Sequence, residues 1–370
     1  MEFTVNALTN ISFTISPRFY LLVQMFALIL SAAVILLFIL LISYHINVSS
    51  KVKQRKQMKE HIEKAAAKAA VASTQDLAES ELPLLEELFS YKGIGVLAEV
   101  LYSMEDEHKE ALIEILTKMN AAEFLRRQLR TGNEDYLVDV LSMVGDLKLI
   151  ELDKEISNII LNKRDNLDVQ FEAFLTLSRL GSRDNIVRIC MDKRFVQQLT
   201  FRSLQEIISA FAGDKRSLYS KLLSAPDAYI TRICIKQIGI EEITALAPDV
   251  ARFLSNKNFN VVIDAAKALG SLRYKPTTEK VLALLQHERW EVRNAAVSAA
   301  ATIDVNSYQD LLITALQDRE WFVRYNAGIA LSHIEDITEI HEKVLATKDR
   351  FAIEMLEYMT QMAEIRRKIV

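Results

Sequence analysis

The pattern of hydrophobic positions begins with one long apolar stretch near the N-terminus. Residues 19–42 are apolar apart from Gln24 and a few serine and alanine positions, and residues 19–50 contain no charged side chain other than the neutral His45. A helix of about 24 residues rises roughly 36 Å, which is enough to cross a bilayer core of about 30 Å. We therefore predict a transmembrane helix over residues 19–44, with the lipid bilayer as its surroundings.

A cleaved signal peptide is the alternative interpretation of this stretch. Its hydrophobic region would be unusually long, basic residues are almost absent before it, and no small-x-small cleavage site follows it. These three features favour the transmembrane helix.

The charges that flank the span predict its orientation. One base, Arg18, and one acid, Glu2, precede it, whereas residues 51–70 hold seven bases and two acids. The positive-inside rule then places residues 1–18 outside the cell membrane, as a short extracytoplasmic tail, and residues 51–370 in the cytoplasm. The membrane-proximal bases have two possible roles: they contact anionic lipid headgroups, or they serve only as the signal that sets the orientation of the span. These bases are Lys51, Lys53, Arg55, Lys56 and Lys59.

The residues that follow the span are rich in Lys, Glu, Gln and Ala, which are strong helix formers. We predict a basic helical stalk over residues 45–72, and Val48–Ser50 marks the break if the stalk and the span are separate helices. Residues 73–131 are expected to form an irregular helical N-terminal cap.

The remaining pattern is helical and repeats itself. Trp290-Glu291-Val292-Arg293 is followed 31 residues later by Trp321-Phe322-Val323-Arg324, and no long period-two alternation appears. Glycines close successive apolar runs and are expected to turn the chain in the left-handed conformation. They are Gly145, Gly181, Gly213, Gly239 and Gly270. We predict an all-α fold: repeats of two short helices over residues 132–347, and a C-terminal capping helix over 348–370.

The motif Trp-x-Val-Arg-x-x-Ala, followed by a turn and a Leu-rich helix, resembles HEAT repeats, especially the short subtype first noted in phycocyanobilin lyases. The resemblance is clear over residues 258–347 and implies an α-α superhelix. It implies that Val292 and Val323 pack inside, with Trp290 and Trp321 at equivalent repeat positions. It also implies that Arg293 and Arg324 form a ladder of polar contacts between adjacent repeats.

Residues that carry chemistry are not arranged in recognisable sites. The six histidines are scattered, and Cys190 and Cys234 lie far apart in apolar contexts. Residues 92–98 match G-x-G-x-x-A, but the preceding Leu82–Phe89 resembles a helix, so a helix–helix turn is preferred over a dinucleotide site. We predict no catalytic residue, cofactor or metal. The acidic balance of residues 71–370 also disfavours nucleic acid as a partner.

One difference between the two aligned repeats suggests a binding surface. The exposed stripe of the first repeat is polar, whereas in the second it is aromatic and aliphatic. Two interpretations remain open: the stripe binds a partner, or the last helix, residues 350–368, covers it with Phe351 and nearby methionines and leucines. The polar stripe is Glu291, Asn294, Ser298 and Thr302, and the apolar one is Phe322, Tyr325, Ile329 and His333.

We therefore expect a non-catalytic, single-pass membrane scaffold whose solenoid binds a protein partner, itself membrane-bound or membrane-associated. Resemblance to membrane-anchored bacterial HEAT proteins suggests a glycosyltransferase of surface-polysaccharide synthesis as that partner. The alternatives are an enzyme built on HEAT repeats, such as a bilin lyase, and a nucleic-acid-binding solenoid.

Overall fold

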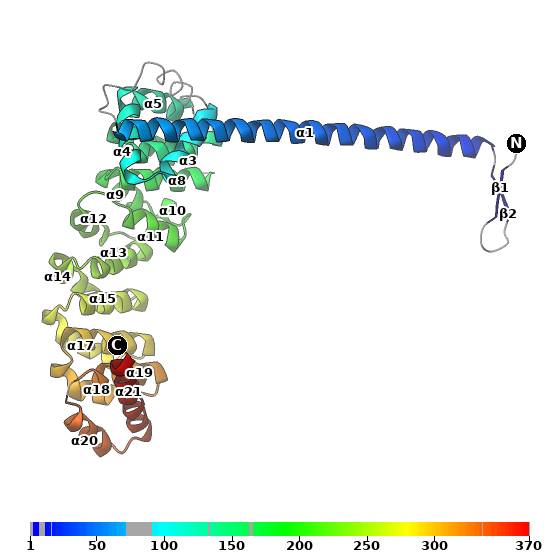
Figure 1. Ribbon diagram of the computed structural model, residues 1–370. Coiled ribbons are helices and arrows are strands. Elements are labelled where there is room, and N and C mark those ends of the chain that lie inside the picture. The colour runs from blue at the N-terminus through cyan, green and yellow to red at the C-terminus, as the bar shows by residue number, and fades with distance from the viewer. Residues whose placement is uncertain are drawn as a thin grey trace. The chain divides into compact units, whose positions relative to one another are not determined.

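A computed structural model describes residues 3–6, 12–15, 17–71, 91–131, 134–162, 166–334 and 336–369. The chain forms two compact units, Met1–Leu116 and Thr117–Val370. Within the described residues both units are helical, apart from one small hairpin (Figure 1). The boundary between the units divides the stretch 73–131 that was expected to form a single cap.

The hairpin lies within residues 1–18, for which the sequence predicts a short tail before the apolar helix. Strand β1, Phe3–Asn6, pairs antiparallel with β2, Ser12–Ile15, and Phe3 lies opposite Ile15. The alternation of polar and apolar residues in these two segments is that of strands, but each segment has only four residues.

Helix α1 runs without interruption from Pro17 to Val71. Proline at the first helical position suits a helix start, because that position needs no N–H donor. Val48–Ser50 lie inside the helix, so the predicted span and stalk are one helix rather than two. Residues from Leu21 onward are long and apolar enough to cross a membrane, and the apolar side chains of this part are exposed.

Helix α3, Tyr91–Ser103, packs against α1 in the first unit and is followed by α4, Asp106–Lys118. On α1, Ile62 is buried, and both Arg55 and Lys59 pair with Glu99 of α3, at 2.9 and 3.2 Å. The turn predicted at residues 92–98 is wrong, because these residues form the first half of α3. Leu82–Phe89 lie outside the described residues.

The second unit begins with α5, Ala121–Thr131, and continues as two stacked columns of helices. Each helix of the first column packs on the next one in that column, and short helices of the second column connect them (Figure 1). The first column is α6 Glu134–Asp146, α8 Leu167–Arg179, α11 Phe201–Ser209, α13 Ala228–Ile240, α15 Phe259–Ser271, α17 Trp290–Asp304, α19 Trp321–Ser332 and α21 Arg350–Ile369. The second is α7 Asp153–Asn162, α9 Arg183–Met191 with α10 Lys193–Val196, α12 Lys215–Leu222, α14 Ala247–Ala251, α16 Thr278–Ala283, α18 Gln309–Ala315 and α20 Thr338–Ala346.

Four of the five punctuating glycines do not adopt the left-handed turn conformation that the sequence predicted. Only Gly181 adopts the left-handed conformation, at φ 68°, whereas Glu242 and Arg273 take it after α13 and α15. Gly239 and Gly270 lie within helices, where an added Cβ would come within 2.9 Å of Ala268 Cα and Ala299 Cα, respectively. Their function is therefore close packing between successive first-column helices.

A continuous core lies between the two columns. It is formed by the first-column positions that the repeat pattern marked as internal, together with leucines and valines of the second column. Val292 and Val323 are both buried, and so are the alanines four residues further on, Ala296 and Ala327. Each first-column helix therefore exposes only the residues on the side that faces away from the core. The stripe that the sequence singled out as a binding surface lies on this side of α19.

Candidate partner-binding surface

The repeat arginine Arg293 joins two consecutive repeats. Its Nε and Nη2 donate to the two carboxylate oxygens of Asp318, at 2.6 and 2.8 Å, and its Nη1 donates to the carbonyls of His287 and Glu288. Both charged side chains are nearly enclosed, with exposed fractions of 7% and 12%. A planar guanidinium suits this bidentate geometry, so Arg293 has the inter-repeat contact that the resemblance implied.

His287 and Asp318, which occupy equivalent positions, organise the turns before α17 and α19. The N–H of Arg289 donates to His287 Nδ1 at 3.1 Å, and the N–H of Glu320 donates to Asp318 Oδ1 at 2.9 Å. Each acceptor satisfies an N–H that the following helix leaves unpaired. Asp318 therefore does two things: it starts α19 and it holds Arg293.

The exposed stripe of α19 carries the residues that the sequence singled out. Phe322 is 53% exposed and His333 is exposed, whereas Tyr325 and Ile329 are half-buried and pack against the core. The neighbouring stripe of α17 is polar, and Asn294 there accepts a hydrogen bond from Asn326 of α19 at 2.6 Å. The polar and apolar stripes therefore lie side by side on adjacent first-column helices.

Aromatic rings are concentrated where α17 and α19 begin. Trp290 stacks on Phe322, with ring centroids 5.4 Å apart, and Trp321 stacks on Tyr325 at 4.7 Å. Trp321 also contacts the edge of Phe322 and remains 48% exposed. The two repeat tryptophans thus form part of an aromatic cluster that is open on one side.

The last helix, α21, packs against α19 and leaves Phe322 and His333 of the stripe exposed, whereas Tyr325 and Ile329 pack against the core cluster to which α21 contributes. Its Met355 and Met359 fit against Gly328 of α19, where an added Cβ would come within 2.9 Å of Met359 Cγ. Phe351, expected in the covering face, is instead 63% exposed. Met355 and Met359 therefore lie on the face of α21 that packs against α19, whereas Phe351 does not.

The exposed side of α21 also carries apolar side chains. Phe351, Tyr358 and Ile365 are all exposed and recur every seven residues, which places them on one face of the helix. Sequence reasoning missed these three residues as surface positions, although their spacing was visible in the chain. We call the combined set the α19–α21 surface: Trp321, Phe322, Tyr325, Ile329, Phe351, Tyr358 and Ile365.

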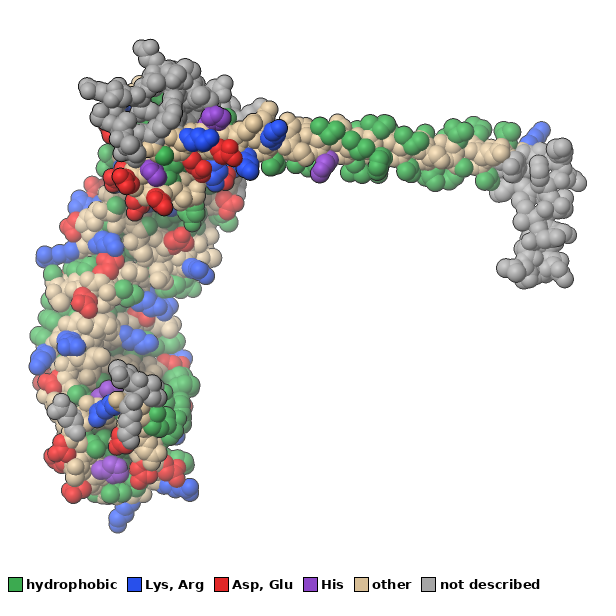
Figure 2. Space-filling model, viewed as in Figure 1, with side chains coloured by type: hydrophobic (Ala, Val, Ile, Leu, Met, Phe, Trp, Pro, Cys, Tyr) green, Lys and Arg blue, Asp and Glu red, His purple; other side chains and the backbone are tan. Residues whose placement is uncertain are grey.

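Figure 2 shows hydrophobic side chains gathered along one edge of the lower part of the second unit, in the region of the last repeats. Exposed aromatic rings of this kind bring a large contact area at a small cost in side-chain entropy. The α19–α21 surface is therefore suited to binding rather than to chemistry.

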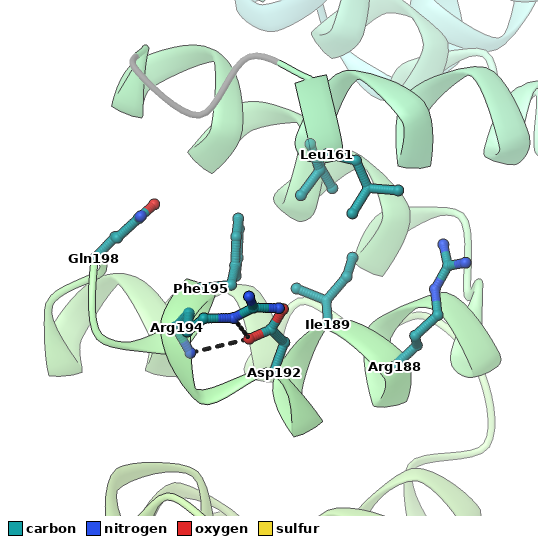
Figure 3. Close-up of a pocket in the computed structure, with 8 residues that line it drawn as sticks. Leu161, Arg188, Ile189, Asp192, Arg194, Phe195 and Gln198 are labelled. Atoms are coloured by element: carbon teal, nitrogen blue, oxygen red, sulfur yellow. Dashed lines mark hydrogen bonds and ion pairs between the residues drawn. The ribbon is translucent and has the colours of Figure 1, made fainter.

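A cavity of about 270 Å³ lies elsewhere in the second unit, between α7, α9 and α10. In Figure 3, Leu161, Ile189 and Phe195 point into it, and Arg194 is paired with Asp192 at 3.2 Å. The charged side chains at its rim therefore already have partners, and its interior is apolar. Nothing in its lining resembles a nucleophile with a base beside it.

The groups that most often carry chemistry are enclosed or dispersed. Cys190 and Cys234 are buried, and burial raises the pKa of both thiols above the ordinary value, which opposes thiolate formation. Within the described residues, no group of three or more His, Cys, Asp or Glu side chains is arranged to hold a metal ion.

The five membrane-proximal bases divide into two sets. Arg55 and Lys59 are ion-paired with Glu99, and their hydrogen bonds, that of Lys59 first, hold the pKa of Glu99 below its usual range. Lys51, Lys53 and Lys56 are exposed. Two of the five thus have a structural role in joining α1 to α3.

Comparisons with known proteins agree with the repeat geometry. Residues 278–347 match the family model of HEAT repeats. No curated protein matches the chain. Among solved structures, an engineered protein shows 16% identity over 82% of this chain and 99% of its own, with a TM-score of 0.38.

The karyopherin Kap121p in complex with Pho4p shows 12% identity over 80% of this chain and 38% of its own, with a TM-score of 0.49. This chain therefore spans well under half of Kap121p. Residues 278–347 are therefore HEAT repeats, and the contact between Arg293 and Asp318 joins two of them.

Proposed function

We propose that this HEAT-repeat protein is a non-catalytic scaffold that binds a protein partner on the α19–α21 surface. The supporting observation is that Trp321, Phe322 and Phe351 are each about half exposed or more, although Tyr325, on which Trp321 stacks, packs against the core. Aromatic side chains bury about 150–250 Å² each, so the seven residues expose an apolar area on the order of 500 Å². Patches of that size on a monomer are commonly interaction sites.

We propose further that α1 anchors the solenoid to a membrane, with the N-terminal tail outside and the repeats in the cytoplasm. The long, apolar and exposed first part of α1 and the basic residues after it support this orientation. Anchoring would confine the solenoid to a thin layer, and thereby raise its effective concentration towards another membrane or membrane-associated protein. A glycosyltransferase of surface-polysaccharide synthesis is the partner that the resemblance suggests.

Crosslinking in native membranes tests the scaffold. A photo-crosslinking amino acid is placed at Tyr358, on the α19–α21 surface, and crosslinked products are purified through the chain and identified by mass spectrometry. We expect one dominant membrane or membrane-associated protein, whose yield falls at least about tenfold when Phe322→Asp puts a charge at the centre of an apolar contact.

Lys267→Asp is the matched control, because Lys267 is exposed on the same face of α15, two repeats away. It should leave the yield unchanged. Equal loss with both variants, or no loss with Phe322→Asp in a folded chain, would remove the α19–α21 surface as the binding site.

A further inference from the structure

Arg324, the repeat arginine that follows Arg293, has hydrogen-bond acceptors for only part of its guanidinium group. Nη1 of Arg324 donates to the carbonyls of Asp318 and Arg319, at 2.7 and 3.1 Å. Arg293 makes the same two contacts one repeat earlier, so the two guanidinium groups are anchored alike on this side.

The two guanidinium groups differ at the edge formed by Nε and Nη2. Nε and Nη2 of Arg293 are taken by Asp318, whereas those of Arg324 have no acceptor among the described residues, and Arg324 Nε is buried. A buried N–H without an acceptor is unfavourable and uncommon, so an acceptor that reached this guanidinium group would stabilise it. Nη2 is not among the buried atoms that lack a partner, so an incoming acceptor would reach this guanidinium group at Nη2 and not at the enclosed Nε.

The start of α21 explains why the chain itself does not fill this edge. Asp349 follows Arg324 by 25 residues, as Asp318 follows Arg293. Asp349 directly precedes α21, however, and its carboxylate accepts the N–H of Ala352 at 3.0 Å. Because α21 begins earlier relative to this aspartate than α19 does relative to Asp318, the guanidinium of Arg324 lies over the ring of Phe351 instead, 5.3 Å from its centroid.

We propose that the partner supplies the missing acceptor as an aspartate or glutamate side chain, and that it places an aromatic residue about four positions later on the α19–α21 surface. The repeat itself shows this pairing: Asp318 binds Arg293, and Phe322, four residues on, stacks on Trp290. Arg324 and Trp321 are the equivalent pair in the last repeat, and both have an unfilled side. This inference rests on the proposed function, because it specifies what binds the same surface.

A pair of capped pentapeptides tests the inference on the full chain in detergent micelles. The first, DREFF, copies residues 318–322 with phenylalanine in place of tryptophan, and the second, NREFF, lacks only the carboxylate of the first residue. Trp290 and Trp321 are the only two tryptophans of the chain and both lie at the site, so their fluorescence reports binding. We expect DREFF to bind about tenfold more tightly than NREFF, because a charge-assisted hydrogen bond to a guanidinium is lost.

Arg324→Gln should abolish this difference by weakening DREFF alone, whereas Arg350→Gln, which changes an exposed arginine nearby, should preserve it. If Arg324→Gln does not fold, the wild-type chain still decides the question, because raising the salt concentration must weaken DREFF more than NREFF. Equal affinities of the two peptides at low salt would contradict the proposed contact between an acidic side chain and Arg324. Such a result would not contradict binding of an aromatic residue on the α19–α21 surface. Binding of neither peptide would overturn the inference, and the crosslinking yield would still test the scaffold independently.

Discussion

Arg293 and Asp318 lie 25 residues apart in the chain and form a nearly enclosed, bidentate ion pair between two repeats. Removing one member leaves the other charge buried without its partner, which costs about 3–5 kcal/mol. We therefore expect Asp318→Ala and Arg293→Met each to lower the free energy of unfolding by about 3 kcal/mol, and the double variant to lose less than the sum. Urea denaturation of the full chain in detergent measures all three. The exposed pair Arg350–Glu354 is the control, and its removal should cost less than about 1 kcal/mol.

The same pair predicts a loss of stability in acid. Burial by itself raises the pKa of Asp318. The hydrogen bonds from Arg293 and from the N–H of Glu320, together with the charge of Arg293, lower this pKa by more than burial raises it. The pKa of Asp318 is therefore below its usual value. A carboxyl whose pKa is lower in the folded state stabilises the fold above its unfolded pKa of about 3.9, and this stabilisation is lost as the pH falls through the folded value. We expect the melting temperature of the wild type to fall below about pH 4 more steeply than that of Asp318→Asn. Parallel pH profiles would show that Asp318 does not contribute.

Two glycines at helix–helix contacts should respond differently to alanine. At Gly239 the new Cβ would meet backbone, Ala268 Cα at 2.9 Å, whereas at Gly328 the nearest atom belongs to the flexible side chain of Met359. Alanine gains about 1 kcal/mol of helix propensity at either site, but backbone cannot move aside as a methionine can. Gly239→Ala should therefore destabilise the chain by about 1–3 kcal/mol, while Gly328→Ala is close to neutral. Similar melting temperatures for the two variants would contradict this packing.

The open aromatic cluster can be measured through its two tryptophans. Trp321 is 48% exposed and Trp290 is half-buried under Phe322, so acrylamide should quench Trp321 more strongly. The variant Trp290→Phe, which keeps Trp321, should show a larger quenching constant and a longer emission wavelength than Trp321→Phe. The reverse order would mean that α21 covers the cluster in solution.

The orientation of α1 in a membrane can be measured by labelling introduced cysteines, because the native thiols are buried and should not react. Cys190 and Cys234 are the only cysteines, both are fully buried, and their raised pKa values keep them protonated, so neither should react with maleimide in the folded chain at neutral pH. A cysteine introduced at Asn6 should then react with an impermeant maleimide on intact cells. One introduced at Lys53 should react only after the cells are opened. Labelling of the unsubstituted chain, or the opposite order, would contradict the burial or the orientation, respectively.

The repeat architecture was predictable because it depends on period. A near-copy at 31 residues, with valine, arginine and alanine at fixed places, specifies which helix faces pack inward, and the structure buries Val292 and Val323 accordingly. The contact between Arg293 and the next repeat followed from the family resemblance. Its acceptor, Asp318, did not, because a partner 25 residues away is fixed by tertiary packing rather than by local pattern.

The misses have physical reasons. Gly239 and Gly270 were read as turns because glycine suits both a left-handed turn and a close helix contact, and sequence alone does not separate the two. Glu242 and Arg273, not these glycines, adopt the left-handed turn conformation. The sequence predicts an exposed apolar stripe on α19 alone, because Phe351 is expected in the face of α21 that covers it. In fact its buried residues and its exposed Phe351 lie on adjacent faces, and only the packing against Gly328 reveals which of them is covered.

The unbroken course of α1 has a mechanical consequence. A helix of 55 residues is roughly 80 Å long, and it contains no glycine and only one proline, at its first residue, that could act as a joint. If its apolar part lies in a bilayer, tilting that part by about 10° swings the far end sideways by more than about 10 Å. Thermal rocking of that part would then move α3, which is joined to α1 by the ion pairs of Glu99, sideways together with the end of α1.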